Sequence, residues 1–148
     1  MSLLDNAPWI REHIELYKRD PVKAHDYTVP GQSEPTPALL LTTIGRKSGE
    51  KRDLPLIYGR DGDRFVIVAS MGGAPEHPSW YKNLQANPRA EVQVANEHHV
   101  VRAYDAEGDE RARLWALMAK IYPPYDEYAA RAKDHREIPV VVLEPVNA

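Results

Sequence analysis

Short connections between strand-like segments constrain the fold of this chain more than any other feature. The Asp61-Gly62 pair is a strong two-residue hairpin signal between two of these segments. Helices do not alternate regularly with the strands, which argues against a doubly wound parallel sheet. The sequence therefore predicts a mainly β fold with flanking helices, built as a small antiparallel barrel of six strands. The six segments are residues 38–44, 51–58, 64–70, 90–94, 98–104 and 138–143.

The chain of 148 residues is predicted to be a single domain over residues 1–148. Residues 38–148 form the barrel with its inserted helices, and residues 1–37 form an N-terminal helix and a proline-rich connection. Within the barrel, residues 78–86 and 108–122 have the pattern of helices. A shorter helix is predicted after the prolines that end the second of these.

The predicted N-terminal helix spans residues 5–19, with Asp5 or Asn6 as its cap. Two interpretations of this helix remain open. It packs on the barrel, or it acts as a mobile lid or a membrane-surface contact through Trp9. The connection that follows, residues 20–37, has no periodic pattern. The apolar face of the helix carries Ile10, Ile14 and Tyr17.

Composition excludes several classes of protein. The chain contains no cysteine, so disulfides, thiolate zinc sites and cysteine nucleophiles are ruled out. No apolar run approaches the roughly 20 residues that cross a bilayer. Charged residues interrupt the one candidate apolar stretch near the N-terminus, so no signal peptide is expected. We therefore expect a cytoplasmic protein, with peripheral membrane contact through the N-terminal helix left open.

A cluster of four fixed positive charges surrounds Gly49 in a chain whose net charge is −3. Such a local cluster on an acidic protein favours a small anionic ligand over general polyanion binding. Guanidinium groups bind phosphate or carboxylate through two parallel hydrogen bonds. The alternative is a solvated charged turn. The lack of a second basic stripe argues against a nucleic-acid-binding module. The four cations are Arg46, Lys47, Lys51 and Arg52.

The next candidate feature is a strand end that opens into glycines, at residues 70–73. Backbone N–H groups without side-chain cover approach a flat ligand or an oxyanion closely, although an ordinary loop has the same composition. Trp80 follows in the next helix, and Asn83 lies on the same side of that helix. Trp80 by itself is more typical of a core residue than of a ligand contact.

Three tyrosines surround the Pro123-Pro124 break, an unusual cluster in a chain with eight tyrosines. Phenols offer an apolar body and a hydrogen-bond donor, which suits a pocket for a flat aromatic substrate. A packed helix face with exposed hydroxyl tips is the alternative. The three residues are Tyr122, Tyr125 and Tyr128.

Motifs for other chemistries are missing. The sequence has no Walker loop, no GxGxxG after a strand and no HExxH. His98 and His99 are adjacent in a predicted strand, so they point to opposite faces and cannot share a metal ion. We expect no metal site.

Three motifs in order resemble the deazaflavin-dependent nitroreductase family, which are split-barrel reductases that use coenzyme F420. The motifs are LLLTTIGRKSG, KRDLPLIY and VIVASMGGAPEHPSWYKNLQANP, and they cover residues 39–96 densely. The tyrosine-bearing segment extends the resemblance to about residue 128. The family implies a six-stranded split β-barrel of the FMN-binding type. It also implies a reduced F420 that delivers a hydride from its deazaflavin ring.

The resemblance also assigns roles to residues. Met71 departs from the family pattern, because some family members have lysine at this position. Methionine here removes one possible cation from the ring or phosphate site. The residues implied to bind the phosphate and oligoglutamate tail are Arg46, Lys47, Ser48 and Arg52. Those implied to border the ring are Ser70, Met71 and Gly72, and the cofactor-binding residues Trp80 and Asn83 are implied to lie in the helix beyond it. Tyr122, Tyr125 and Tyr128 are implied to line the substrate side, and with Ser70 they are the candidate catalytic residues.

The resemblance predicts an F420-dependent oxidoreductase that reduces an electron-poor conjugated acceptor. Quinones, nitroaromatics and enones or lactones are the candidate substrates. Two alternatives remain: an FMN-dependent split-barrel oxidoreductase, whose phosphate would lie on Arg46 and Lys47, and a carrier that binds F420 without catalysis. The sequence indicates neither the physiological acceptor nor the oligomeric state.

Overall fold

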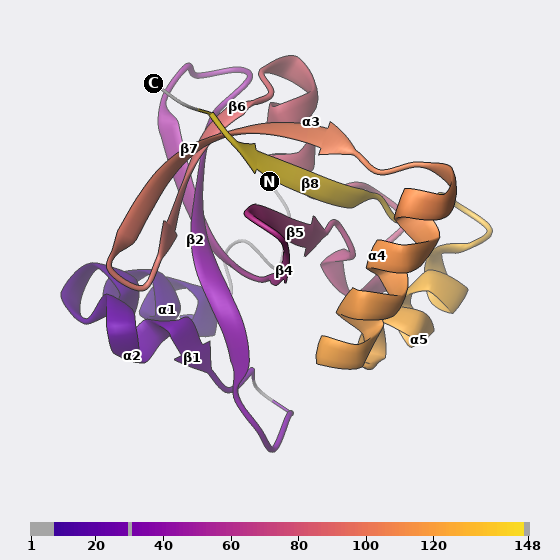
Figure 1. The fold of residues 1–148 in the computed structure, drawn as a ribbon, viewed down its shortest axis with the longest axis horizontal. Helices are drawn as coiled ribbons and strands as arrows, with labels where there is room; N and C mark the ends of the chain where they lie inside the picture. The colour runs from indigo at the N-terminus through magenta and orange to yellow at the C-terminus, as the bar shows by residue number, and fades with distance from the viewer. Residues whose placement is uncertain (1–7, 30, 147–148) are drawn as a thin grey trace.

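The computed structural model describes residues 8–29 and 31–146, and these residues form one antiparallel sheet with helices around it (Figure 1). The strands are β1 (Asp26–Tyr27), β2 (Thr36–Ile44), β3 (Lys51–Ile57), β4 (Gly59–Asp61), β5 (Arg64–Val68), β6 (Arg89–Val94), β7 (Glu97–Asp105) and β8 (Val140–Pro145). The helices are α1 (Pro8–Arg19), α2 (Pro21–His25), α3 (Ser79–Ala86), α4 (Gly108–Ile121) and α5 (Pro124–Ala132), with a 3₁₀ turn η2 (Met71–Gly73).

The strand order is β1-β2-β6-β7-β8-β5-β4, and β3 pairs with β2 outside this path. Every paired strand is antiparallel. This confirms the predicted antiparallel class, although the described residues contain eight strands instead of six. The two additional strands are the short β1 and β4. β4 begins directly after β3, and its hairpin to β5 closes over Gly62, whose φ of 64° is the left-handed conformation that glycine favours.

Strand β5 separates two hydrophobic cores. Phe65 and Ile67 point into one core, among the strands, while Val66 and Val68 point into the other, against α4 and α5. Successive side chains of a strand leave on opposite faces, so a strand buried on both faces is apolar throughout. The second core fixes the two C-terminal helices, and Met118 of α4 is fully buried in it.

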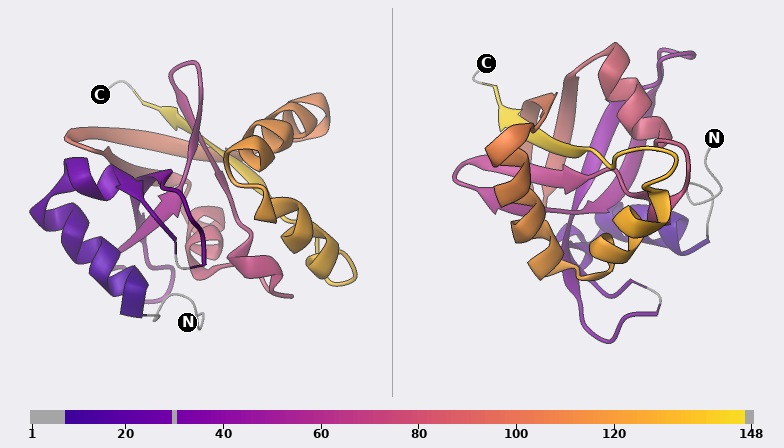
Figure 2. Two further views of the ribbon diagram at one scale, coloured as in Figure 1. Left: turned by 90° about the horizontal axis from the view of Figure 1, so that it is seen from below. Right: turned by 90° about the vertical axis from the view of Figure 1, so that its right-hand side faces the viewer.

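The N-terminal helices and the α4–α5 pair lie on opposite sides of the molecule, with the strands between them (Figures 1 and 2). Helix α1 buries Ile10, His13 and Tyr17, whereas Ile14, predicted on the apolar face, is only half-buried. The Tyr17 hydroxyl donates to the backbone oxygen of Ala38 at 2.5 Å and accepts from the backbone N–H of Ala95 at 3.2 Å. These contacts attach α1 to the sheet.

The connection over residues 20–37 has no periodic pattern in its sequence, yet its first part forms the helix α2. Asp20 caps α2 by accepting a hydrogen bond from the backbone N–H of Lys23 at 3.2 Å, and Pro21 occupies the first turn. A cap and a proline produce a helix of one turn without any hydrophobic period. The predicted cap of α1, Asp5 or Asn6, lies outside the described residues. No helix in the described ranges is both long and apolar enough to span a membrane.

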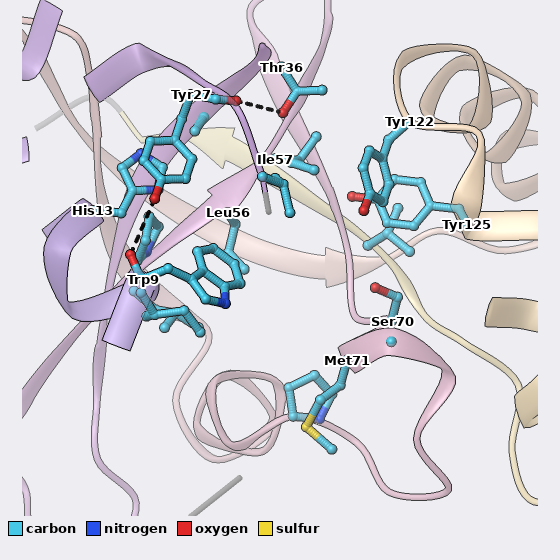
Figure 3. A pocket seen from close by; sticks show the side chains of 18 of the residues that line it. Trp9, His13, Tyr27, Thr36, Leu56, Ile57, Ser70, Met71, Tyr122 and Tyr125 are labelled. Atoms are coloured by element: carbon cyan, nitrogen blue, oxygen red, sulfur yellow. Dashed lines mark hydrogen bonds between the residues drawn. The ribbon is translucent and has the colours of Figure 1, made fainter. Parts of the chain in front are cut away.

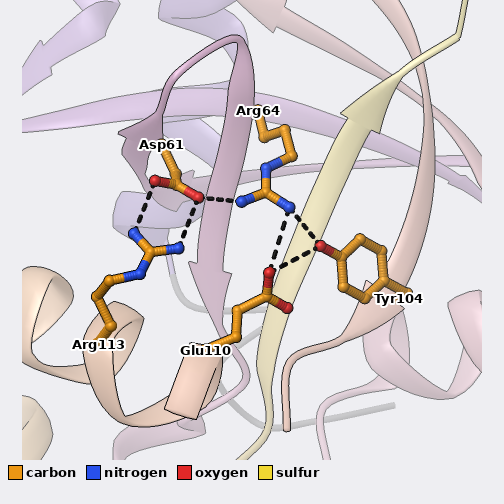
Figure 4. Close-up of polar contacts among 5 residues, drawn as sticks. All are labelled: Asp61, Arg64, Tyr104, Glu110 and Arg113. Carbon is orange, nitrogen blue, oxygen red and sulfur yellow. Dashed lines mark hydrogen bonds and ion pairs between the residues drawn. The ribbon is translucent and has the colours of Figure 1, made fainter.

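A polar network attaches the β4–β5 hairpin to α4 (Figure 4). Arg113 holds Asp61 with two hydrogen bonds, of 2.8 and 3.1 Å, and Arg64 pairs with the same carboxylate. Arg64 also donates to the Tyr104 hydroxyl at 2.5 Å and to Glu110 at 3.3 Å. The hydrogen bonds that Asp61 accepts, first from Arg113 and then from Arg64, lower its pKa to about 2.

Candidate functional site

Two adjoining cavities contain all the residues to which the sequence assigned a site role. The first, here called the aromatic cavity, has a volume of about 350 Å³, and the second, the cationic cavity, about 530 Å³. Leu54 and Trp80 line both, so the two cavities meet at these side chains. The aromatic cavity contains Ser70, Met71, Gly72, Tyr122, Tyr125 and Tyr128. The cationic cavity contains Arg46, Lys47, Ser48, Arg52 and Asn83.

The tyrosine cluster forms one wall of the aromatic cavity (Figure 3). Tyr122 is the C-cap of α4, and after the proline break Tyr125 and Tyr128 lie on α5 with their rings close to it. The ring of Tyr122 lies 5.0 Å from that of Tyr125 and 6.3 Å from that of Tyr128, and the Tyr122 and Tyr128 hydroxyl oxygens are 3.3 Å apart. Burial raises the pKa of the Tyr122 and Tyr125 phenols, so both remain protonated donors at neutral pH.

A second aromatic wall faces the tyrosines, and the sequence patterns did not predict it. Figure 3 shows Trp9, His13 and Tyr27 on the side of the cavity opposite Tyr122 and Tyr125. The Tyr27 ring stacks on His13 at 3.7 Å between centroids and on Trp9 at 6.2 Å. The sequence feature that could have indicated this wall is the spacing of four residues between Trp9 and His13, which places both on one face of α1.

His13 is buried in this wall as a neutral ring. Its Nε2 lies 2.9 Å from the backbone oxygen of Ala24, which can only accept, so the proton is assigned to Nε2. Burial lowers the pKa of His13, opposed by this hydrogen bond. The imidazole therefore contributes a flat uncharged surface.

The loop after β5 closes the third side of the aromatic cavity. Ser70 and Met71 lie below the two aromatic walls in Figure 3. Met71, Gly72 and Gly73 all have positive φ, at 43°, 64° and 81°. A Cβ at Gly73 would lie 2.9 Å from the backbone oxygen of Tyr128, so glycine permits close contact between the loop and α5. The loop thus depends on helix α5 for its position.

The aromatic cavity is uncharged. Within the part of the chain that the structure describes, no Asp, Glu, Lys or Arg lines it, and its apolar walls include Leu56 and Ile57 of β3. An ion that entered would lose its hydration without a counter-charge, which costs several kcal/mol. The cavity therefore suits a flat neutral molecule.

Charge is concentrated in the cationic cavity. Five of its lining residues are cations, and Asp53 is the single carboxylate among the described lining residues. Lys18 of α1 joins the four cations of the predicted cluster, and the sequence did not indicate it, because it is far from them along the chain. The five cations are Lys18, Arg46, Lys47, Lys51 and Arg52.

Asn83 holds Arg46 in the cationic cavity. Its Oδ1 accepts from the backbone N–H of Arg46 at 3.2 Å and from Nη1 of the same residue at 2.9 Å. Its Nδ2 donates to the Thr43 hydroxyl at 3.1 Å, so both ends of the amide are used. Asn83 is buried, and its helix α3 also carries Trp80, so one helix positions a cation of one cavity and one of the two side chains that line both cavities.

The remaining cations have weak, exchangeable partners. Arg52 is 3.4 Å from the Ser48 hydroxyl and 3.7 Å from the Glu50 carboxylate, while Lys18 is 3.6 Å from Asp53. Lys51 pairs with Glu91 at 3.1 Å. Exposed ion pairs of this kind contribute roughly 0–1 kcal/mol, so an anionic ligand displaces them at little cost. No group of three or more His, Cys, Asp or Glu within the described residues could hold a metal ion.

Fold and site together define a class: a small antiparallel barrel with a neutral aromatic cavity next to a cationic cavity. A model of the F420H(2)-dependent quinone reductase family matches residues 9–145. The chain belongs to this family. It is therefore an oxidoreductase, and its cofactor is F420, which confirms the resemblance found in the sequence.

Similar proteins agree with this assignment. The F420H(2)-dependent quinone reductase Rv1261c of Mycobacterium tuberculosis is 35% identical over 154 residues, covering 95% of this chain and 98% of that protein. A solved structure of an F420-H2 dependent reductase, FDR-A, is 42% identical with a TM-score of 0.67, covering 72% of this chain and 93% of that one. Another, described as a domain-swapped dimer, is 37% identical with a TM-score of 0.70, covering 92% and 97%.

Proposed function

We propose that this protein transfers a hydride from reduced F420 to a flat, uncharged, electron-poor acceptor, with quinones as the first substrate class. The observation that carries the proposal is the junction of the two cavities at Leu54 and Trp80. A ligand with an anionic tail and a flat ring would have its tail in one cavity and its ring at the edge of the other. The acceptor would then occupy the rest of the aromatic cavity.

The cationic cavity fits the phosphodiester and oligoglutamate tail. Arg46 and Arg52 would bind tail oxygens through their guanidinium groups, and Lys47 would add a third positive charge, with the Ser48 hydroxyl beside Arg52. Each charge-assisted hydrogen bond contributes roughly 1.5–3 kcal/mol. The single phosphate of FMN would use only part of this charge. The cavity therefore favours F420 over the FMN alternative.

The ring would lie where the two cavities join. Trp80 would border it from α3, and Ser70, Met71 and Gly72 would border it from the loop after β5. When bound, reduced F420 supplies a hydride from its deazaflavin ring. The protein's part is to hold the acceptor against this position and to exclude water from it.

Between the aromatic walls, the acceptor would stack on uncharged rings and receive hydrogen bonds from phenols. Tyr122 and Tyr125 are protonated at neutral pH like any phenol, and burial raises the pKa of each further, so their hydroxyls can donate to a quinone oxygen. A quinone that gains a hydride also needs one proton to become the hydroquinone. The paired hydroxyls of Tyr122 and Tyr128, 3.3 Å apart, provide a path for that proton from solvent, with the Ser70 hydroxyl as the other candidate donor.

Nitroaromatics and enones or lactones are also flat, neutral and electron-poor, so the same cavity would accept them as secondary substrates. A carrier that only binds F420 would not require a second aromatic cavity next to the cofactor site. Since one similar structure is described as a domain-swapped dimer, this chain is expected to form oligomers as well. The N-terminal segment would act as a wall of the substrate cavity, which requires no membrane contact.

The test is turnover of a neutral quinone. Reduced F420 and the protein are mixed with menadione, and the return of oxidised F420 absorbance is followed. The proposal predicts oxidation of F420 that depends on both the protein and the quinone. F420 binding without any acceptor-dependent oxidation across quinones, nitroaromatics and enones would indicate the carrier instead.

A further inference from the structure

The loop from Ser70 to Ala74 borders both the cofactor position and the acceptor, yet its backbone is in an unfavourable conformation. Met71 has a φ of 43°, a region that residues with a Cβ rarely adopt, and it is followed by Gly72 and Gly73 in the same region. Two short-range hydrogen bonds hold the loop from within, from Gly73 to Ser70 at 2.9 Å and from Ala74 to Met71 at 3.1 Å. A conformation of this kind persists where the surroundings hold it in place.

A side chain from outside the loop, Arg136, makes most of the hydrogen bonds that hold it from outside. The guanidinium of Arg136 donates to three backbone oxygens: Nη1 to Ala69 at 2.9 Å, Nη2 to Ser70 at 2.8 Å and Nε to Ala74 at 2.9 Å. Nη1 also lies 3.1 Å from Nδ1 of His77. Two of these four contacts go to Ala69 and Ser70, before the positive-φ residues 71–73, and two go to Ala74 and His77, after them. Only a planar fork with five N–H donors can make them together.

Arg136 connects this loop to the helix that carries the tyrosines. Its backbone N–H donates to the backbone oxygen of Ala132 at 2.9 Å, at the end of α5. From the same helix, Arg131 donates to the Gly72 oxygen at 2.8 Å, and Gly73 packs against the Tyr128 backbone. The loop and α5 are thereby held as one unit.

We propose that Arg136 is a positioning residue, which fixes the Ser70–Ala74 loop relative to Tyr125 and Tyr128 and so sets the separation between cofactor ring and acceptor. Arg136 lines neither cavity, so it acts through the loop and not by contact with a ligand. The hydrogen bonds from Arg136 to the loop, here called the clamp, are independent of the ligand. The effect of the clamp on hydride transfer rests on the proposed function. A displacement of about 1 Å between reacting groups lowers a rate by up to about a hundredfold.

The clamp can be tested without cofactor or substrate. The chain has three methionines, of which Met71 lies in the loop and Met118, on α4, is fully buried. In protein labelled with ¹³C at the methionine methyl groups, Met71 is identified by its loss in Met71→Leu. We expect Arg136→Ala to shift or broaden the Met71 signal while the Met118 signal stays, and millimolar guanidinium to restore it. Arg136→Lys, which keeps the charge without the fork, should resemble Arg136→Ala.

Arg113→Ala is the matched control, because it removes a guanidinium of α4 whose hydrogen bonds go to Asp61 of β4 and not to the Ser70–Ala74 loop, so it should leave both signals in place. An unchanged Met71 signal in Arg136→Ala would overturn the proposal. So would a joint change of Met71 and Met118, since that would reveal a general loss of stability, or a normal spectrum in Arg136→Lys.

The consequence for the reaction is measured in a single turnover with saturating reduced F420 and menadione. Arg136→Ala should lower the hydride-transfer rate by about ten- to a hundredfold. Its Kd for F420 should stay unchanged, because the cationic cavity is untouched, and guanidinium should recover part of the rate. A raised Kd with an unchanged rate per bound cofactor would contradict the positioning role. If the wild-type protein did not bind F420, the proposed function would fail while the methionine spectra still decided the clamp.

Discussion

Asn83 accepts two hydrogen bonds from Arg46, one from its backbone N–H and one from Nη1, at 3.2 and 2.9 Å. A buried amide on α3 thus fixes both the turn after β2 and the direction of its guanidinium. The resemblance implied that Asn83 belongs to the cofactor site, in the helix beyond the ring, and its contacts make it a support for Arg46, a cation proposed to bind the tail. Preorganised cations bind an anion more tightly, because less side-chain freedom is lost on binding.

We expect Asn83→Ala to weaken F420 binding by about tenfold, or about 1.4 kcal/mol. The change also leaves the Thr43 hydroxyl and the Arg46 N–H without partners, which should lower the free energy of unfolding by about 1–3 kcal/mol. Fluorescence titration and urea unfolding measure the two effects. Asn87→Ala, which loses one exposed bond to the Arg89 N–H, is the control. An unchanged Kd for Asn83→Ala would show that Arg46 needs no support.

The tyrosine wall should act in catalysis and not in cofactor binding. Tyr125→Phe and Tyr128→Phe each remove a hydroxyl from the aromatic cavity while the cationic cavity stays intact. We expect F420 affinity to stay close to the wild-type value and turnover of menadione to fall by about tenfold, the value of one lost hydrogen bond in the transition state. If both variants lost the cofactor and kept their rate per bound F420, the tyrosines would belong to the cofactor site.

The uncharged cavity predicts discrimination by substrate charge. A neutral naphthoquinone should react with a kcat/KM at least about a hundredfold above that of a naphthoquinone sulfonate, because the sulfonate would be buried without a counter-charge. The sulfonate withdraws electrons, so chemistry alone would favour it. The intrinsic reactivity of each quinone is measured as its rate with reduced F420 in the absence of protein, and the kcat/KM values are compared with it. Equal values of kcat/KM would mean that the acceptor does not enter the aromatic cavity.

Asp61 should make the hairpin attachment sensitive to acid. Hydrogen bonds from Arg113 and Arg64 lower its pKa to about 2 in the folded protein, from about 3.8 when unfolded. Because the folded pKa is depressed, the stabilisation is complete above about pH 4 and is lost as the pH falls toward 2. Urea midpoints of wild type and Asp61→Asn should therefore differ at pH 7 and converge on acidification. Asp63→Asn, in the same turn, is the control, and a gap independent of pH would contradict the linkage.

Local patterns made much of the fold and site predictable. The Asp61-Gly62 hairpin is specified by neighbouring residues, and the cations around Gly49 and the tyrosines around Pro123 are close together in sequence. The short strand β1 and the one-turn helix α2 escaped prediction because neither is long enough for a hydrophobic period.

Other site features depend on contacts between distant segments, which a single sequence does not reveal. The wall of Trp9, His13 and Tyr27 becomes a wall only when α1 packs against the sheet, through the Tyr17 hydrogen bonds. Arg136 is similar, because its partners are backbone oxygens more than sixty residues earlier in the chain. Backbone oxygens carry no sequence signature.

The central claim is that one F420 molecule spans both cavities, and a comparative titration tests it most directly. Ligand fluorescence is followed as F420 or FMN is added to wild type, to Lys47→Ala/Arg52→Ala and to the control Lys120→Ala/Lys133→Ala, which removes the same charge from exposed positions on the other side of the molecule. We predict tight F420 and weak FMN binding to wild type and control. The Lys47→Ala/Arg52→Ala variant should bind F420 more weakly than wild type by roughly 3–6 kcal/mol. An F420 Kd that is equal in all three proteins, or a preference for FMN, would contradict the account.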